Sequence, residues 1–84
     1  MVSPGWVAPS ASSAVAVGAS PFSFQSTVPG NVNVSAGTVS LIEISRDGVS
    51  FVTTALLGGM FFLGPGDFLQ VTYAVAPAMT WFPI

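Results

Sequence analysis

Short turn signals divide most of this chain into segments that are too brief for ordinary helices. Clusters of Gly, Pro, Asn and Asp recur about every ten residues. They stand at Pro29-Gly30-Asn31, Ala36-Gly37, Asp47-Gly48, Gly58-Gly59 and Gly64-Pro65-Gly66-Asp67. The runs between them are rich in Val, Phe, Thr and Ile, which favour strands, and no window combines a helix cap with a 3.6-residue apolar stripe. The sequence therefore predicts an all-β fold, a small antiparallel β-sandwich or jelly-roll-like domain of about seven strands.

Alternating apolar residues mark the individual strands. The clearest is expected over 68–75, where Leu69, Val71, Tyr73 and Val75 share one face. Shorter strands are expected around Phe22 and Phe24, around Val32 and Val34, over 60–63 and over 79–82. In the strand predicted over 38–45, Leu41-Ile42 breaks the alternation, which indicates either burial on both faces or a β-bulge.

Two turns carry the most specific local signals. Asp47-Gly48 predicts a tight hairpin that joins 38–45 to 49–54, with Gly48 at a positive φ that a β-carbon would oppose. Gly66 and Asp67 belong to the turn that precedes the strand over 68–75. Because Asp beside a turn Gly commonly accepts hydrogen bonds from the local backbone, both aspartates are interpreted as structural turn residues.

The first nineteen residues differ from the rest in composition. They consist mainly of Ala, Ser, Val, Gly and Pro with a single Trp6, whereas 20–84 contains every Phe and every charged side chain. We therefore expect an extended N-terminal arm over 1–19 and a sandwich domain over 20–84. The arm is either a disordered tail or a strand, over 13–17, that is added to a neighbouring subunit with Trp6 as an anchor.

The inventory of charged and reactive side chains excludes most chemistry. Among 84 residues there is one cation, Arg46, with three carboxylates and no Lys, His or Cys. No imidazole, thiolate or ammonium is present for acid–base, nucleophilic or soft-metal chemistry. The three acids are too few for a calcium site and sit where a turn or strand explains them better than a catalytic pair does. We expect no enzyme activity, catalytic residue, cofactor or metal.

The same inventory limits the partners. A chain with a net charge of −2 repels nucleic acid phosphates. The longest uncharged window, 48–66, is interrupted by Ser, Thr and paired Gly, so we expect no membrane span. A third hypothesis, an accessory fragment that inserts in a membrane, is kept only as an alternative.

The aromatic residues point to association instead. Charged residues make up 5 % of the chain, whereas a soluble domain has roughly 25 %. A domain this small also usually needs a disulfide, a bound metal or a partner subunit for stability. Adjacent Phe61 and Phe62 must point to opposite faces of a strand, so one of them is expected to meet another subunit, and the same holds for Trp81 and Phe82. The predicted interface residues are Trp6, Phe61, Phe62, Trp81 and Phe82.

A succession of turn glycines and strands links this chain to a known class. The segments are Gly37-Thr38-Val39, 42–48, Gly59-Met60-Phe61, Leu63-x-Pro65-Gly66-Asp67, Val71-Thr72-Tyr73 and Ala76-Pro77-x-Met79-Thr80. Over about Pro21–Pro83 the pattern resembles small β domains in structural proteins of tailed bacteriophages. Such modules decorate capsids or sit in head fibres and spikes.

That resemblance implies a non-enzymatic virion structural protein on the capsid exterior, a decoration or cement protein that stabilises the phage head. Its expected partners are further copies of itself, most simply in a homotrimer, and the major capsid protein. The alternative is a carbohydrate- or host-binding module of a phage fibre or spike, with Tyr73 and Trp81 as an aromatic stacking platform.

Overall fold

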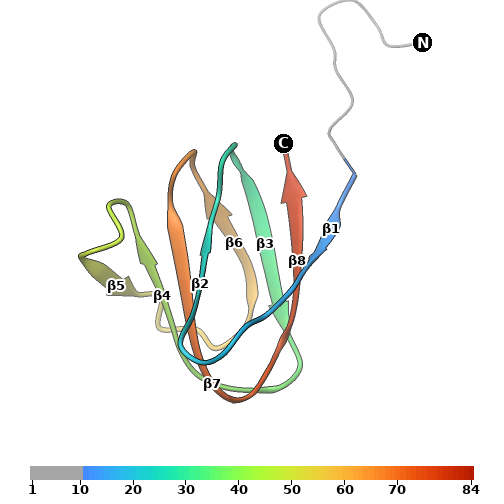
Figure 1. Ribbon diagram of the computed structural model, residues 1–84, viewed down its shortest axis with the longest axis vertical. Helices are drawn as coiled ribbons and strands as arrows, with labels where there is room; N and C mark the ends of the chain where they lie inside the picture. Colours follow the sequence, from blue (N-terminus) through green and yellow to red (C-terminus); the bar gives the residue numbers. More distant parts are fainter. Residues whose placement is uncertain (1–10) are drawn as a thin grey trace, which may run out of the picture.

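The computed structural model describes residues 11–84, which form eight strands and no helix (Figure 1). The strands are β1 (Ser13–Val15), β2 (Phe22–Gln25), β3 (Gly30–Ser35), β4 (Thr38–Ser45), β5 (Phe51–Thr53), β6 (Gly59–Leu63), β7 (Phe68–Val75) and β8 (Ala78–Pro83). They make two four-stranded antiparallel sheets, so the predicted all-β sandwich is confirmed. Over the same residues there is no helix long and apolar enough to cross a membrane.

Each sheet mixes strands from distant parts of the sequence. Sheet A has the order β1-β8-β3-β6 and sheet B the order β2-β7-β4-β5, with every neighbouring pair antiparallel. In sheet A the first strand therefore lies beside the last, and β3 lies between β8 and β6. The edges of the two sheets are formed by β1 and β6 and by β2 and β5.

The N-terminal arm is not separate from the domain in the part that the structure describes. Ser13, Ala14 and Val15 pair with Trp81, Thr80 and Met79 of the same chain. The strand predicted near 13–17 therefore exists, but it completes its own sheet rather than a neighbour's, and it is not a disordered tail. The boundary expected between residues 19 and 20 does not divide the sandwich. Trp6 lies outside the described residues.

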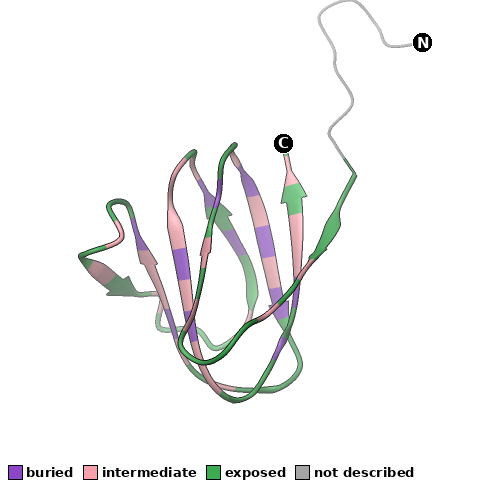
Figure 2. Cartoon of the chain, in the orientation of Figure 1, coloured by how far each residue is buried: buried purple, intermediate pink, exposed green. Residues whose placement is uncertain are grey.

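The core follows the predicted alternation. In β3, Val32 and Val34 are buried while Asn31 and Asn33 point outward, and β7 buries Leu69 and Val71 in the same way. Figure 2 shows this as purple segments alternating with pink along both strands. The buried apolar residues are Val32, Val34, Ile42, Phe61, Leu63, Leu69, Val71 and Met79. Because both sheets contribute, these residues hold the two layers together.

The irregularity expected at Leu41-Ile42 is a β-bulge. Val39 lies opposite Tyr73 and Leu41 opposite Thr72, so the register between β4 and β7 shifts near Ser40. After the shift, Ile42 points into the core and is fully buried. Of the two alternatives that the sequence left open, the bulge is the correct one.

The two sheets are staggered sideways. The Phe24 ring of β2 packs on the Trp81 ring of β8, with 5.1 Å between centroids and a 53° angle between planes. Across sheet B, Leu69, Ile44 and Val52 lie opposite one another in β7, β4 and β5 and so share the core-facing side. Leu69 is 0 % exposed, whereas Val52 is 70 % exposed. No described part of sheet A therefore covers β5, and β5 and β1 lie at opposite sides of the sandwich (Figure 1).

Candidate interaction surface

The outer face of sheet A is an uncharged surface. We define this outer face by the outward residues of its strands, which are Ala14, Asn31, Asn33, Ser35, Met60, Phe62, Ala78, Thr80 and Phe82. All four charged side chains of the chain, by contrast, lie in β4 or in the turns after β4 and β6. A partner that covered the outer face would not have to desolvate any charged group. It would therefore avoid the large desolvation penalty of buried charges.

Two of the predicted interface residues lie in one row on this face. Asn31 lies opposite Phe62 on one side and opposite Phe82 on the other, which makes a cross-strand row of phenyl, amide and phenyl. Phe62 is 60 % exposed and Phe82 is 38 % exposed, and Met60 of β6 is exposed beside Phe62. The sequence did not indicate that Phe62 and Phe82, twenty residues apart, lie in one row with Asn31 between them. That arrangement depends on β3 pairing with both β6 and β8.

The other two members of the predicted pairs belong to the interior. Phe61 is 6 % exposed and is part of the core, as expected for a residue that alternates with Phe62. Trp81 faces sheet B and packs against the core. A partner can therefore reach Phe62 and Phe82, while Phe61 and Trp81 support them from below. The interface role itself stays a prediction.

The aromatic platform proposed for sugar binding is not formed. Trp81 lies across β3, since a β-carbon on Gly30 would stand 2.8 Å from its ring and 2.6 Å from the Phe82 carbonyl oxygen. Tyr73 is on the core-facing side of sheet B, where its hydroxyl donates to the Gly18 carbonyl. The two rings thus pack against the interior from different sheets rather than side by side on the surface.

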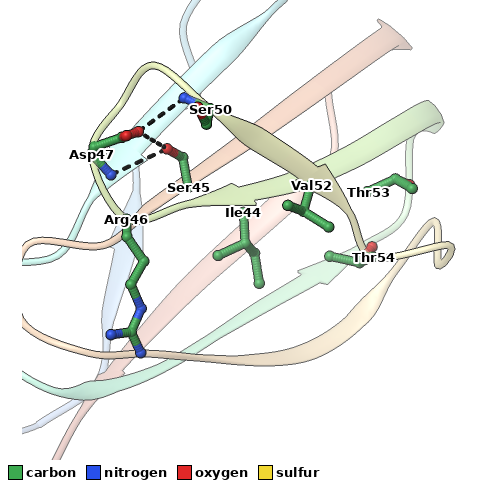
Figure 3. A pocket seen from close by; sticks show the side chains of 8 residues that line it. All are labelled: Ile44, Ser45, Arg46, Asp47, Ser50, Val52, Thr53 and Thr54. Atoms are coloured by element: carbon green, nitrogen blue, oxygen red, sulfur yellow. Dashed lines mark hydrogen bonds between the residues drawn. The ribbon is translucent and has the colours of Figure 1, made fainter.

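The turn after β4 is organised by two polar side chains. Ser45 is buried, and its hydroxyl oxygen accepts a hydrogen bond from the Gly48 N–H at 2.8 Å. One carboxylate oxygen of Asp47 accepts from the Ser50 N–H at 2.9 Å and from the Ser45 hydroxyl at 3.0 Å (Figure 3). The same oxygen accepts from the Val49 N–H at 2.8 Å. These donors favour the charged carboxylate and hold the pKa of Asp47 below its ordinary value.

This turn differs in one respect from the prediction. Gly48 has φ of +78°, which confirms the left-handed position. The loop, however, contains five residues, 46–50, because Ser45 pairs with Phe51 and β5 starts only there. The antiparallel pairing is confirmed, but the second strand was expected to start at Val49, and that start was wrong because the side chains of Ser45 and Asp47 satisfy the N–H groups of a wider loop.

The turn before β7 is fastened to the end of β2. Gly66 is again at a positive φ, +83°, and Asp67 accepts a hydrogen bond from the Gly64 N–H through its carboxylate at 2.8 Å. Ser26 is buried, and its hydroxyl donates to the carbonyl oxygens of Gly64 at 2.5 Å and Asp67 at 3.3 Å. The ion pair between Arg46 and Asp67, at 3.8 Å, involves a guanidinium that is 90 % exposed, so it adds little.

A hollow of about 400 Å³ lies on the uncovered side of β4 and β5. It is lined by Ile44, Ser45, Arg46, Asp47, Ser50, Val52, Thr53 and Thr54. In Figure 3 the side chains of Ile44 and Val52 project to the same side of the two strands. The hollow is therefore the space that the stagger of the sheets leaves in front of β5. Sequence reasoning missed it because exposure of Val52 depends on which strand lies opposite.

The groups on these surfaces suit packing and hydrogen bonding. The outer face offers phenyl rings, a thioether and two amides, and the hollow has an apolar floor with hydroxyl groups, Arg46 and Asp47 around it. Among residues 11–84, no three acidic, His or Cys side chains come together as metal ligands. No family model matches this chain, and no curated protein or solved structure matches it.

Proposed function

We propose that this protein is a non-enzymatic structural protein that decorates the exterior of a tailed-phage capsid and stabilises the head. Its partners are further copies of itself, in a homotrimer, and the major capsid protein. One observation carries the proposal, namely the charge-free outer face of sheet A with Phe62 and Phe82 in one row. The resemblance of 21–83 to phage β domains supports the choice of a capsid as the partner.

The physical argument is one of many weak contacts. Each copy supplies a small apolar and amide surface, and a lattice repeats that contact at every equivalent position. Linked copies bind far more tightly than single ones because the second contact is intramolecular. A protein that binds the assembled lattice and not its free subunits stabilises the lattice by mass action.

Composition of intact particles tests the proposal directly. Phage particles that carry this protein would be purified and their proteins quantified by electrophoresis and mass spectrometry. A decoration protein is expected in constant proportion to the major capsid protein. A small fixed number of copies per particle would instead favour the fibre or spike alternative, and absence from particles would overturn the proposal.

Particle strength gives a second test. Particles that lack the protein should assemble, but should rupture at a lower temperature or under milder osmotic shock. Adding back the wild-type protein should restore strength, whereas Phe82→Ser should not. Val49→Ser is the matched control, because Val49 is an exposed apolar residue outside the outer face. Particles that are equally robust without the protein but fail to attach to cells would replace the decoration role by host binding.

A further inference from the structure

The staggered sheets leave one strand unmatched at each side of the sandwich. At one side β5 extends beyond sheet A, and Val52 on its core-facing side is 70 % exposed. At the other side β1 is the last strand of sheet A, with Ser13 and Ala14 exposed and Val15 half-buried. In a second copy, β1 therefore matches the gap in front of β5 of the first copy.

The strand directions make these two sides compatible. Each sheet has four strands that alternate in direction, so its two edge strands run antiparallel to each other. If a second copy is placed beside the first in the same orientation, its β1 therefore runs antiparallel to β6 of the first copy. The same holds for β2 of the second copy and β5 of the first. Antiparallel pairing is available in both layers without turning either copy over.

We propose that copies of this chain join head to tail through an overlapping edge joint. In this joint β1 of one copy adds to the free edge of β6 in the next and lies in front of its β5, so that Val15 covers Val52 and Ile44. The inference rests on the self-association in the proposed function and specifies its geometry. Because the two surfaces differ, the contact repeats until it closes into a ring, such as the proposed trimer.

Three properties of β6 favour this role for its edge. Among the four edge strands β6 is the longest, at five residues against three for β1, four for β2 and three for β5. Its sequence, Gly59 to Leu63, contains no proline and no charge, and its pairing with β3 shows no register shift. Proteins usually protect a free edge by making the strand short or by placing a proline, a charge or a bulge in it. An edge without these features, such as that of β6, is suited to pairing.

The side chains that β1 would meet in the joint are free of charge. Ser13, Ala14 and Val15 would meet Met60, Phe62, Ile44 and Val52, and none of these is ionisable. The two charged residues that line the hollow, Arg46 and Asp47, lie in the exposed loop before β5, so closing the joint buries mainly apolar surface.

The extension of β5 beyond sheet A also excludes a symmetric dimer. In such a dimer two copies would pair β6 with β6 about a two-fold axis. In that dimer, however, β5 of each copy would occupy the place of β4 in the other, because β5 extends one strand beyond β6. Only a single added strand fits in front of β5, and β1 at the edge of sheet A is such a strand.

Engineered cysteines test the joint, since the chain has none of its own. Ala14 and Met60 are the two ends of one cross-strand row through Thr80 and Asn33. Three strand spacings, about 14 Å, separate them within one copy. A disulfide requires Cα atoms within about 7 Å, so the double variant Ala14→Cys/Met60→Cys can close a disulfide only between copies.

Oxidation of this full-length double variant is expected to give covalent oligomers of three or more chains. Each single variant can link two chains at most. Ala14→Cys/Phe62→Cys covers the neighbouring register, and Ala14→Cys/Val49→Cys is the control, because Val49 lies in the loop before β5. If neither test pair gives more cross-linking than the control, the joint is wrong.

Sedimentation of the purified protein gives an independent readout. Val52→Asp should weaken association at least about 100-fold, because the joint would bury an unpaired carboxylate. Its circular dichroism and melting should match the wild type, since Val52 is largely exposed in one copy. Val49→Asp should leave association unchanged.

The outcomes separate the joint from the proposed function. An oligomer that resists Val52→Asp, or that stops at two chains, would overturn the joint while leaving capsid decoration intact. Absence of the protein from phage particles would overturn decoration while leaving the joint measurable in the purified protein.

Discussion

Phe61 and Phe62 are neighbours in β6 with opposite environments. Phe61 is 6 % exposed and lies in the core between the sheets, whereas Phe62 is 60 % exposed on the outer face of sheet A. Their backbones pair with Val32 and Asn31 in β3, which are buried and outward-pointing in the same order. One strand thus connects the core to the proposed interface.

Substitutions at these two positions should separate stability from binding. Phe61→Ala should lower the free energy of unfolding by about 3–5 kcal/mol, because it leaves a cavity in a small core. Phe62→Ser should change it by less than about 0.5 kcal/mol and should weaken association. Urea titration and sedimentation of both variants measure the difference. Equal loss of stability in the two variants would contradict the assignment of faces.

Gly48→Val should destabilise the turn after β4. A β-branched residue at φ of +78° is strained, and a β-carbon there would stand 3.1 Å from the Phe68 ring. The expected cost is on the order of 1–2 kcal/mol or more. Ser50→Ala is the control, since only the backbone N–H of Ser50 bonds to Asp47. Urea midpoints that agree between Gly48→Val and the control would refute the strain argument.

The Asp47 carboxylate should make stability depend on acid pH. Hydrogen bonds from Ser50, Val49 and Ser45 lower its pKa in the folded state, whereas an unfolded chain has the ordinary value of about 3.9. The stabilisation is therefore complete above about pH 4 and is lost as the pH falls through the lower, folded-state pKa. Urea midpoints measured between about pH 5 and pH 2 should show this loss. Asp47→Asn should remove that part of the pH dependence, and a variant with an unchanged profile would contradict it.

Ser26→Ala should loosen the turn before β7. The buried hydroxyl donates to the Gly64 and Asp67 carbonyl oxygens, and its removal leaves each of them with one backbone N–H donor. A loss of about 0.5–1.5 kcal/mol is expected. Thr27→Ala, at the exposed neighbouring position, should cost little by the same thermal-melting measurement. A Ser26→Ala melting curve that overlays the Thr27→Ala curve would show that the hydroxyl contributes nothing.

Binding to particles should depend little on salt. The outer face of sheet A contains no charged residue, so no ion pair is available to be screened. Affinity measured by co-sedimentation with particles should change less than about twofold between roughly 0.05 and 0.5 M NaCl. A steep decline would show that charged residues such as Arg46 carry the contact instead.

Local sequence signals predicted local structure well. Alternation in β3 and β7 identified the inward valines and leucines, and the break at Leu41-Ile42 allowed for the bulge. Gly48 was assigned its positive φ because few other residues tolerate that conformation. Each of these features depends on residues a few positions apart.

The arrangement between strands could not be predicted in the same way. Nothing near Asn31 indicates that its two neighbours are Phe62 and Phe82, and nothing near Val52 indicates that no strand lies opposite. Both facts depend on the order of strands in the sheets, which many alternating segments satisfy equally well. The same limit explains why neither alternative for the arm, a disordered tail or a strand added to a neighbouring subunit, placed β1 in its own sheet.

The position of β8 between β1 and β3 has a consequence for synthesis on the ribosome. β8 is the last of the described strands, yet within residues 11–84 β1 pairs with no other strand and β3 gains its second partner only from β8. Until translation reaches β8, the described part of sheet A consists of one non-local pair, β3 with β6. The nascent chain therefore leaves Val15 of β1 and the second edge of β3 uncovered through most of translation, a period in which a chaperone could bind them.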